Sequence, residues 1–188
     1  MQCEKTLIVK AAQQADTSGE ALPGNFVARQ GIVGGYCVNI AGLESRDQRL
    51  SREHARFCGL LAHDGTLGEM AVVNLVQDGL PVNVIEIFIK AGITQQEVYE
   101  LVAPRRTLTH RRAKSEPLSP GESDRAVRLA RVLAQAESVF DSKEKAMNWL
   151  RCPMKRFDGR APLRMLETDV GSRLVEEALV QIDEGFFA

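Results

Sequence analysis

Apolar side chains recur at helical spacing through most of the chain beyond residue 68. The clearest case lies between residues 123 and 140, where apolar positions three and four residues apart cover one face of a helix. This spacing predicts one long amphipathic helix, and shorter apolar periods before and after it predict further helices. The apolar positions of the long helix are Ala126, Leu129, Ala130, Leu133, Ala136 and Phe140.

Capping residues mark where several of these helices begin. Thr94 with Glu97, and Ser119 with Glu122, form capping boxes, in which each side chain accepts a hydrogen bond from the other residue's backbone N–H. The first box opens a short helix that ends near residue 102, and Pro104 starts the next helix after a brief turn. Two helices around such a turn predict a helix-turn-helix.

Residues 1–68 follow a different pattern. Glycine, proline and asparagine gather in "TSGEALPGN" and "GIVGGYCVN", which predicts turns with a strand among them. Residues 45–62 are polar and compatible with a helix. We expect an irregular N-terminal extension here, to which the sequence assigns no function.

Composition narrows the class of protein. The 188 residues are 44% hydrophobic and 26% charged, as in ordinary globular proteins, and the net charge of −1 excludes nucleic-acid binding through overall charge. The four cysteines are scattered and form no CxxC pair, which suits reduced thiols. No signal peptide or membrane span is expected, so the sequence predicts a cytoplasmic protein without a membrane partner.

Positive charge gathers around a predicted helix at residues 105–112. From Arg105 to Arg131 the chain carries 8 Lys and Arg against 3 acids. On a helix, Leu108 faces the core and Arg106 and His110 lie about 160° away from it, where they suit base edges, while neighbouring cations suit phosphates. A solvated surface helix is the alternative. The candidate DNA-binding residues are Arg105, Arg106, Thr107, Thr109, His110, Arg111, Arg112 and Lys114.

The end of the chain has the opposite charge. From Leu174 to Ala188 there are 4 acids and no base, on a helix predicted to start at Thr168 or Asp169 and to stop at Gly185. We expect Leu174, Val175, Ala178, Leu179 and Ile182 to face inward. The acidic helix and its apolar end either fold back on their own domain or bind a partner protein. The candidate partner-binding residues are Glu176, Glu177, Glu184, Gly185, Phe186 and Phe187.

Other chemistry has little support in the sequence. His54 and Cys58 are four residues apart and suit one helix face, and His63 follows, but a zinc site needs four well-placed ligands and only Cys37 or Cys3 could complete it. The glycine-rich run lacks the Lys-Ser/Thr of a phosphate loop, and no nucleophile motif is present. We therefore expect no enzyme, no metal site and no cofactor.

Four segments resemble the antitoxins of the Xre/MbcA/ParS group, which are partners of RES-domain toxins in bacterial type II toxin–antitoxin pairs. The resemblance covers roughly residues 80 to 188, in the family's order, and "KRFDG" departs from an apolar-small-Gly turn that the family commonly has. The segments are "GITQQEVYELVAPRRTLTHRR", "LSPGESDRAVRLARVLAQAESVF", "AMNWLRCP" and "GRAPLRMLETDVGSRLVEEALVQIDEGFFA".

The resemblance implies a mostly α fold with an Xre-like helix-turn-helix domain followed by a small helical toxin-binding domain. We assign residues 1–68 to the extension, 69–138 to DNA binding and dimerisation, and 139–188 to toxin binding. The implied function is to occlude the active site of a cognate RES-domain toxin that depletes NAD, and to repress the protein's own promoter. A homodimer is expected, with the long helix at 123–140 as its candidate surface.

Two rival hypotheses remain. One is a stand-alone helix-turn-helix transcriptional regulator whose C-terminal domain serves only dimerisation. The other is an enzyme with a site hidden in residues 1–68, around His54, Cys58 and His63.

Overall fold

The computed structural model describes residues 30–33, 36–39 and 46–185. The chain divides into two compact units, and the second begins at Leu50. In the first unit, strands β1 (Gln30–Val33) and β2 (Tyr36–Asn39) pair in an antiparallel hairpin. This hairpin accounts for the strand expected in the glycine-rich run.

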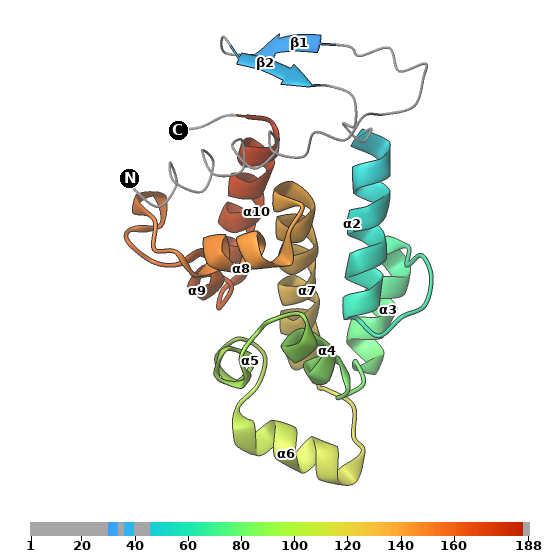
Figure 1. Cartoon of the computed structure of the whole chain (residues 1–188). Helices are drawn as coiled ribbons and strands as arrows, with labels where there is room; N and C mark the ends of the chain where they lie inside the picture. The colour runs from blue at the N-terminus through green and yellow to red at the C-terminus, as the bar shows by residue number, and fades with distance from the viewer. Residues whose placement is uncertain (1–29, 34–35, 40–45, 186–188) are drawn as a thin grey trace. The chain divides into compact units, whose positions relative to one another are not determined.

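The rest of the described chain is helical, as predicted (Figure 1). Its connections are short turns, and one isolated bridge joins Met154 to Arg160. The helices are α2 (Arg46–Leu60), α3 (Glu69–Asp78), α4 (Val84–Lys90), α5 (Gln95–Leu101), α6 (Arg105–Lys114), α7 (Pro120–Phe140), α8 (Lys143–Arg151), the 3-10 helix η2 (Lys155–Phe157), α9 (Pro162–Met165) and α10 (Asp169–Asp183).

Both capping boxes form as predicted. Thr94 N donates to Glu97 Oε2 at 2.7 Å, and Glu97 N donates to Thr94 Oγ1 at 3.2 Å. Ser119 and Glu122 form the same reciprocal pair at the start of α7. These bonds satisfy backbone N–H groups that have no partner inside the helix, and so they fix where α5 and α7 begin.

Helix α7 is the centre of the helical unit, and α3, α8 and α10 all pack against it. Five of its six predicted apolar positions are buried, and Phe140 is half-buried against the Trp149 ring. The long helix was also the candidate surface for a dimer. Its apolar face packs instead against the surrounding helices of the same chain and forms their common core.

The helix-turn-helix consists of α5, a turn at residues 102–104, and α6. Val102 and Ala103 in this turn are buried. Arg125 on α7 donates from Nε to the Val102 carbonyl oxygen at 2.7 Å, which satisfies a carbonyl at the end of α5. The turn is therefore fixed both by burial and by a side chain from the central helix. Of the helices described, none is both long and apolar enough to cross a membrane.

Candidate DNA-binding helix and toxin-binding face

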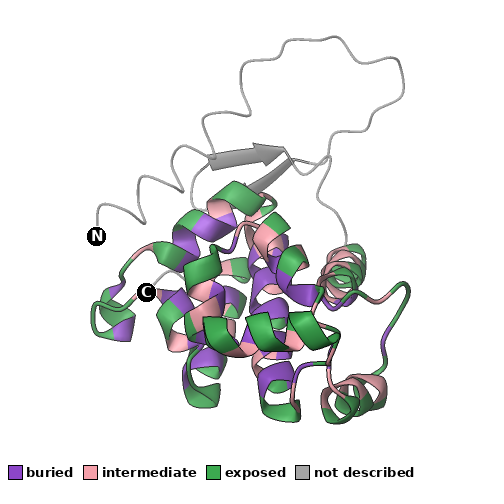
Figure 2. Ribbon diagram, turned by 90° about the horizontal axis from the view of Figure 1, so that it is seen from below, coloured by how far each residue is buried: buried purple, intermediate pink, exposed green. Residues whose placement is uncertain are grey.

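The basic helix α6 presents most of its polar side chains to solvent. Leu108 is buried and anchors the helix to the core, as the sequence predicts. Figure 2 shows most of this helix as exposed. Thr107 and Arg111 are half-buried, and the exposed members of the candidate set are Arg105, Arg106, Thr109, His110, Arg112 and Lys114.

Arg111 is engaged within the chain. Its Nε lies 2.8 Å from Glu122 Oε2, and its Nη1 donates to the Pro117 carbonyl oxygen at 2.8 Å. Glu122 is buried, so this ion pair compensates a carboxylate that has lost its water. Arg111 is therefore less available to a DNA phosphate than the sequence predicts, because it ties the loop after α6 to the start of α7.

The other cations of α6 are freer. Arg112 Nη2 lies 3.5 Å from Glu86 Oε1, and Lys114 Nζ lies 3.9 Å from Glu116 Oε1. Exposed ion pairs of this kind contribute little to stability and give way readily to another anion. Within the part of the chain that the structure describes, three side chains on the exposed face have no ion pair or hydrogen bond. They are Arg105, Arg106 and His110.

Helix α10 exposes apolar side chains beside its acids. Val170 is 71% exposed, Leu174 43% and Val180 44%. The prediction that Leu174 faces inward is wrong, because the buried stripe runs through Gly171, Val175, Ala178 and Leu179 and leaves Leu174 at its edge. Val170 and Val180 lie outside the stripe predicted from the sequence, which could have identified them as exposed, whereas Leu174 lay inside it.

The predicted acidic residues of α10 divide into two groups. Glu177 and Glu184 are exposed, and Glu177 accepts a hydrogen bond from Gln181 Nε2 at 3.2 Å within the same helix. Glu176 points instead toward α7, where its Oε1 lies 3.9 Å from Arg131 Nη1. Gly185 is exposed and ends the helix with a φ of 78°, as predicted. Phe186 and Phe187 lie outside the described residues.

The inner edge of α10 concentrates negative charge. Burial raises the pKa of Glu176, and nearby Asp169 adds to the shift although Arg131 opposes it. Burial also raises the pKa of Glu53 on α2, and the like charges of Asp183 and Glu176 raise it further. Both carboxylates are therefore less favourably ionised here than in water.

On α2, His54 and Cys58 are in contact, and His63 lies beyond the end of this helix. Cys58 Sγ lies 3.6 Å from His54 Nε2, so the predicted shared helix face exists for these two residues. Cys58 is buried. No group of three or more metal-ligating side chains is found among the described residues.

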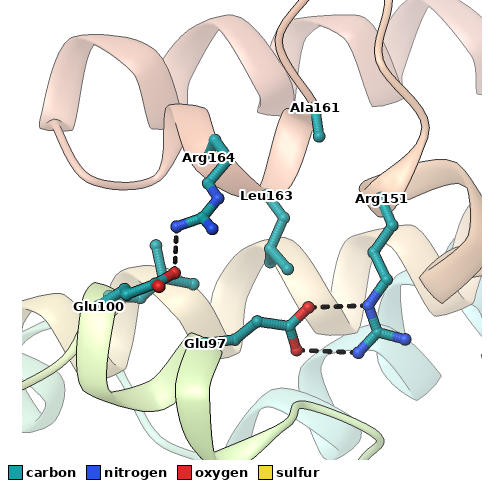
Figure 3. Close-up of a pocket in the computed structure, with 7 residues that line it drawn as sticks. Glu97, Glu100, Arg151, Ala161, Leu163 and Arg164 are labelled. Carbon is teal, nitrogen blue, oxygen red and sulfur yellow. Dashed lines mark hydrogen bonds and ion pairs between the residues drawn. The ribbon is translucent and has the colours of Figure 1, made fainter.

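A polar contact that the sequence did not predict joins α5 to α8 and α9 (Figure 3). Arg151 binds Glu97 with two parallel contacts, Nε to Oε1 and Nη2 to Oε2, each 2.8 Å long. Arg164 pairs with Glu100 beside them. The contact surrounds a cavity of about 130 Å³. Its lining residues are Glu97, Glu100, Leu101, Arg151, Ala161, Leu163 and Arg164.

Both glutamates of this contact are held in their charged form. Burial acts to raise the pKa of Glu97, but hydrogen bonds from Arg151 and Thr94 outweigh it, and the pKa falls below its ordinary value. A hydrogen bond from Gln96, and then one from Arg164, lower the pKa of Glu100. Charge-assisted hydrogen bonds of this kind are stronger than neutral ones.

Two family models match consecutive parts of the helical region. Residues 71–131 match the antitoxin Xre-like helix-turn-helix domain, and residues 135–185 match the antitoxin Xre/MbcA/ParS C-terminal toxin-binding domain. A protein named Antitoxin Xre from Pseudomonas putida is 34% identical over 141 residues, which cover 75% of this chain and 89% of the relative. The chain belongs to the Xre antitoxin family.

Other antitoxins are also similar to this Xre-family chain. An Antitoxin Xre from Yersinia enterocolitica is 33% identical over 136 residues, which cover 71% of this chain and 89% of the relative. A protein of Sphingobium sp. named Prs ADP-ribosylating antitoxin is 30% identical over 127 residues, which cover 62% and 80%. Helix α6 lies within the matched helix-turn-helix range, and α10 lies within the toxin-binding range. Membership of this family implies DNA and a cognate toxin as partners.

Proposed function

We propose that this antitoxin neutralises a RES-domain toxin that depletes NAD, by covering the toxin's active-site cleft. Three exposed apolar side chains of α10, Val170, Leu174 and Val180, carry the proposal. Large apolar side chains that gather on a surface mark interaction sites, and these three lie inside the matched toxin-binding range. Glu177 and Glu184 provide a polar rim, as is usual around an apolar interface centre.

The predicted toxin-binding set is extended by these apolar residues. Glu177, Glu184, Gly185, Phe186 and Phe187 stay in the proposed contact. Glu176 acts on it indirectly, since its carboxylate faces Arg131 on α7. In this proposal the chain acts by binding, without catalysis and without a cofactor.

The chemistry of the toxin is proposed from two sources. The family resemblance points to RES-domain toxins, which deplete NAD. One relative bears the name Prs ADP-ribosylating antitoxin, and ADP-ribosylation consumes NAD as its donor. Both sources agree on a toxin that binds NAD.

The test is to purify the chain with the product of the adjacent gene and to follow NAD in the mixture. We expect NAD loss with the neighbouring protein alone, and its suppression by a stoichiometric amount of this chain. Measuring ADP-ribose transfer to protein in the same samples separates hydrolysis of NAD from transfer. A neighbouring protein that binds the chain but does not consume NAD would contradict the proposed toxin class. Failure to bind would favour the stand-alone regulator.

We also propose that the chain represses its own promoter through α6. Arg106 and His110 are placed to read base edges, with Thr107 and Thr109 beside them, while Arg105, Arg112 and Lys114 contact phosphates. Their exposure and their few internal partners support this role. Binding to promoter DNA, compared with binding to a duplex of scrambled sequence at the same salt concentration, tests it.

A homodimer is proposed to match a two-fold operator. Because the apolar face of α7 is buried within the chain, α3 is the more suitable surface. It exposes Met70 (69%) and Val73 (44%) inside or next to the helix-turn-helix range. Molar mass in solution tests the proposal, and we expect Met70→Asp to shift the protein toward the monomer.

A further inference from the structure

The contact in Figure 3 belongs to a longer polar seam between the two matched regions. Lys143 Nζ donates to the Lys90 carbonyl oxygen, and Arg151 Nη2 donates to the Gly92 carbonyl oxygen at 2.8 Å. We use the word seam for these two bonds together with the pairs Arg151–Glu97 and Arg164–Glu100. Its donors all lie in the toxin-binding range, 135–185, and its acceptors all lie in the helix-turn-helix range, 71–131.

The seam acts on the start of α5, the first helix of the helix-turn-helix. Glu97 has two tasks there, because its Oε2 accepts from Thr94 N in the capping box while both carboxylate oxygens bind Arg151. The carbonyls of Lys90 and Gly92 belong to the end of α4 and the turn that leads to α5. Cations placed against the negative end of a helix are favourable. The toxin-binding region therefore fixes the position of α5 through side chains.

The position of α5 determines that of α6. Leu101 at the end of α5 is buried, and the turn that follows is short and buried as well. Helix α6 has a single buried side chain of its own, Leu108, and its ion pairs to other helices lie toward its C-terminal end, where Arg111 meets Glu122. The N-terminal end, which carries Arg105 and Arg106, follows directly from the buried turn after α5. A rotation of α5 is thus transmitted to α6, since the buried turn cannot absorb it without exposing apolar atoms.

We propose that Arg151 and Arg164 are positioning residues for DNA binding. By holding α5, they keep α6 in the orientation that reads DNA, so the region matched as toxin-binding is also part of the DNA-binding machinery. The inference rests on the proposed binding of promoter DNA by α6. It adds that DNA affinity depends on residues that do not touch DNA.

A charge exchange at the exposed pair tests the inference in the full-length chain. Arg164→Glu places a carboxylate opposite Glu100 and should weaken binding to promoter DNA about three- to tenfold, since a single exposed pair contributes little. The double variant Glu100→Arg with Arg164→Glu restores the pair with reversed polarity and the original net charge. We expect it to recover DNA affinity to within about twofold.

Arg173→Glu is the matched control. Arg173 is also an exposed arginine of the toxin-binding range, but it pairs with Asp169 within α10 and lies outside the seam. It makes the same change in net charge and should leave DNA affinity nearly unchanged. A further variant, Glu100→Gln with Arg164→Gln, removes the pair without changing net charge. Its affinity should fall while the slope of affinity against salt stays constant, because no phosphate contact is lost.

Three results would overturn the inference. The first is equal DNA affinity in Arg164→Glu and Arg173→Glu, and the second is failure of the charge exchange to restore binding. The third is a parallel loss of toxin binding in Arg164→Glu, which indicates general unfolding in place of a positioning role. If the wild-type chain binds no promoter DNA, the proposed DNA-binding function fails and takes the inference with it. Normal wild-type binding with unchanged variants removes the inference alone.

Discussion

Helices α6 and α10 both expose their candidate residues, but they do so in opposite ways. Apart from Leu108 and the small Ala113, every side chain of helix α6 is polar, and its exposed face carries arginine and histidine. Helix α10 has a complete buried stripe and still exposes three large apolar side chains next to glutamates. Helix α6 exposes charged side chains and buries only a small apolar part, whereas helix α10 exposes apolar side chains and buries a large apolar face.

This difference teaches what each surface can bind. Phosphates are recognised by charge and hydrogen bonds, so a helix that binds DNA needs little apolar surface of its own. A protein partner is bound mainly by apolar burial at the centre of the interface, with charges at its rim. The two helices therefore support two different partners, and substitutions in each should affect one partner and spare the other.

The largest effect is expected for an apolar-to-acidic change on α10. Val180→Asp should reduce toxin affinity at least about thirtyfold, because a charge introduced into an apolar contact must be buried without a partner. The measurement is a binding isotherm with the purified toxin. Promoter affinity should remain within about twofold of wild type.

Val73→Asp on α3 provides a matched control for that substitution in the toxin-binding assay alone, since Val73 also belongs to the proposed dimer surface. Val73 and Val180 are the same residue type and each is 44% exposed, but Val73 lies outside the toxin-binding range. Its toxin affinity should be close to that of the wild type. Equal losses in the two variants would show that exposure alone, and not the α10 face, determines the effect.

The next effect concerns sequence reading by α6. Arg106→Ala should lower affinity for promoter DNA by about 1–3 kcal/mol and reduce the preference over a scrambled duplex, since a base contact is lost. Arg112→Ala should weaken both duplexes alike and lower the salt slope by about one. An equal loss on both duplexes in Arg106→Ala would assign Arg106 to phosphate.

The local part of this fold could be predicted from the sequence, and the long-range part could not. The capping boxes at Thr94 and Ser119, and the inward position of Leu108, follow from interactions within one helical turn. The Arg151–Glu97 and Arg164–Glu100 pairs join residues 54 and 64 positions apart. Nothing in the local pattern indicates which of many charged residues will meet after the helices have packed.

The candidate sites show the same limit. Charge segregation pointed to α6 and α10, and both helices are exposed where the pattern placed them. The roles of single residues were less predictable, because Arg111 forms an ion pair with Glu122 and Glu176 forms one with Arg131. The burial of Leu174 was wrongly predicted because this residue lies at the edge of the buried stripe of α10. The spacing of apolar residues alone does not show how much of that face a neighbouring helix covers.

A smaller effect should separate Arg111 from its neighbours on α6. Arg111→Ala leaves the buried Glu122 carboxylate without its cation and should lower the free energy of unfolding by about 1–2 kcal/mol. Arg112→Ala should change it by less than about 0.5 kcal/mol, since its pair with Glu86 is exposed. Urea denaturation measures both. A stable Arg111→Ala variant with a reduced salt slope would return Arg111 to the phosphate contacts.

The smallest effect concerns the acidic inner edge of α10. The pKa of Glu53 is raised by burial and by Asp183 and Glu176, so the folded state holds its proton to higher pH than the unfolded state does. Folding stability is therefore present below the ordinary glutamate pKa and is partly lost as pH rises through the folded pKa. Glu53→Gln should remove this loss and stabilise the protein at neutral pH by less than about 1 kcal/mol, because Glu53 is half-exposed.

Denaturation midpoints of wild type and Glu53→Gln, measured from acid to neutral pH, check this sign. The two curves should converge at acid pH and separate as pH rises, with the variant above. The opposite pH dependence is expected for the glutamates of the seam. The pKa values of Glu97 and Glu100 are lowered in the folded state, so their contribution to folding stability is lost as pH falls. Curves that stay parallel throughout would mean that burial and the acids of α10 do not raise the pKa of Glu53 in the folded state.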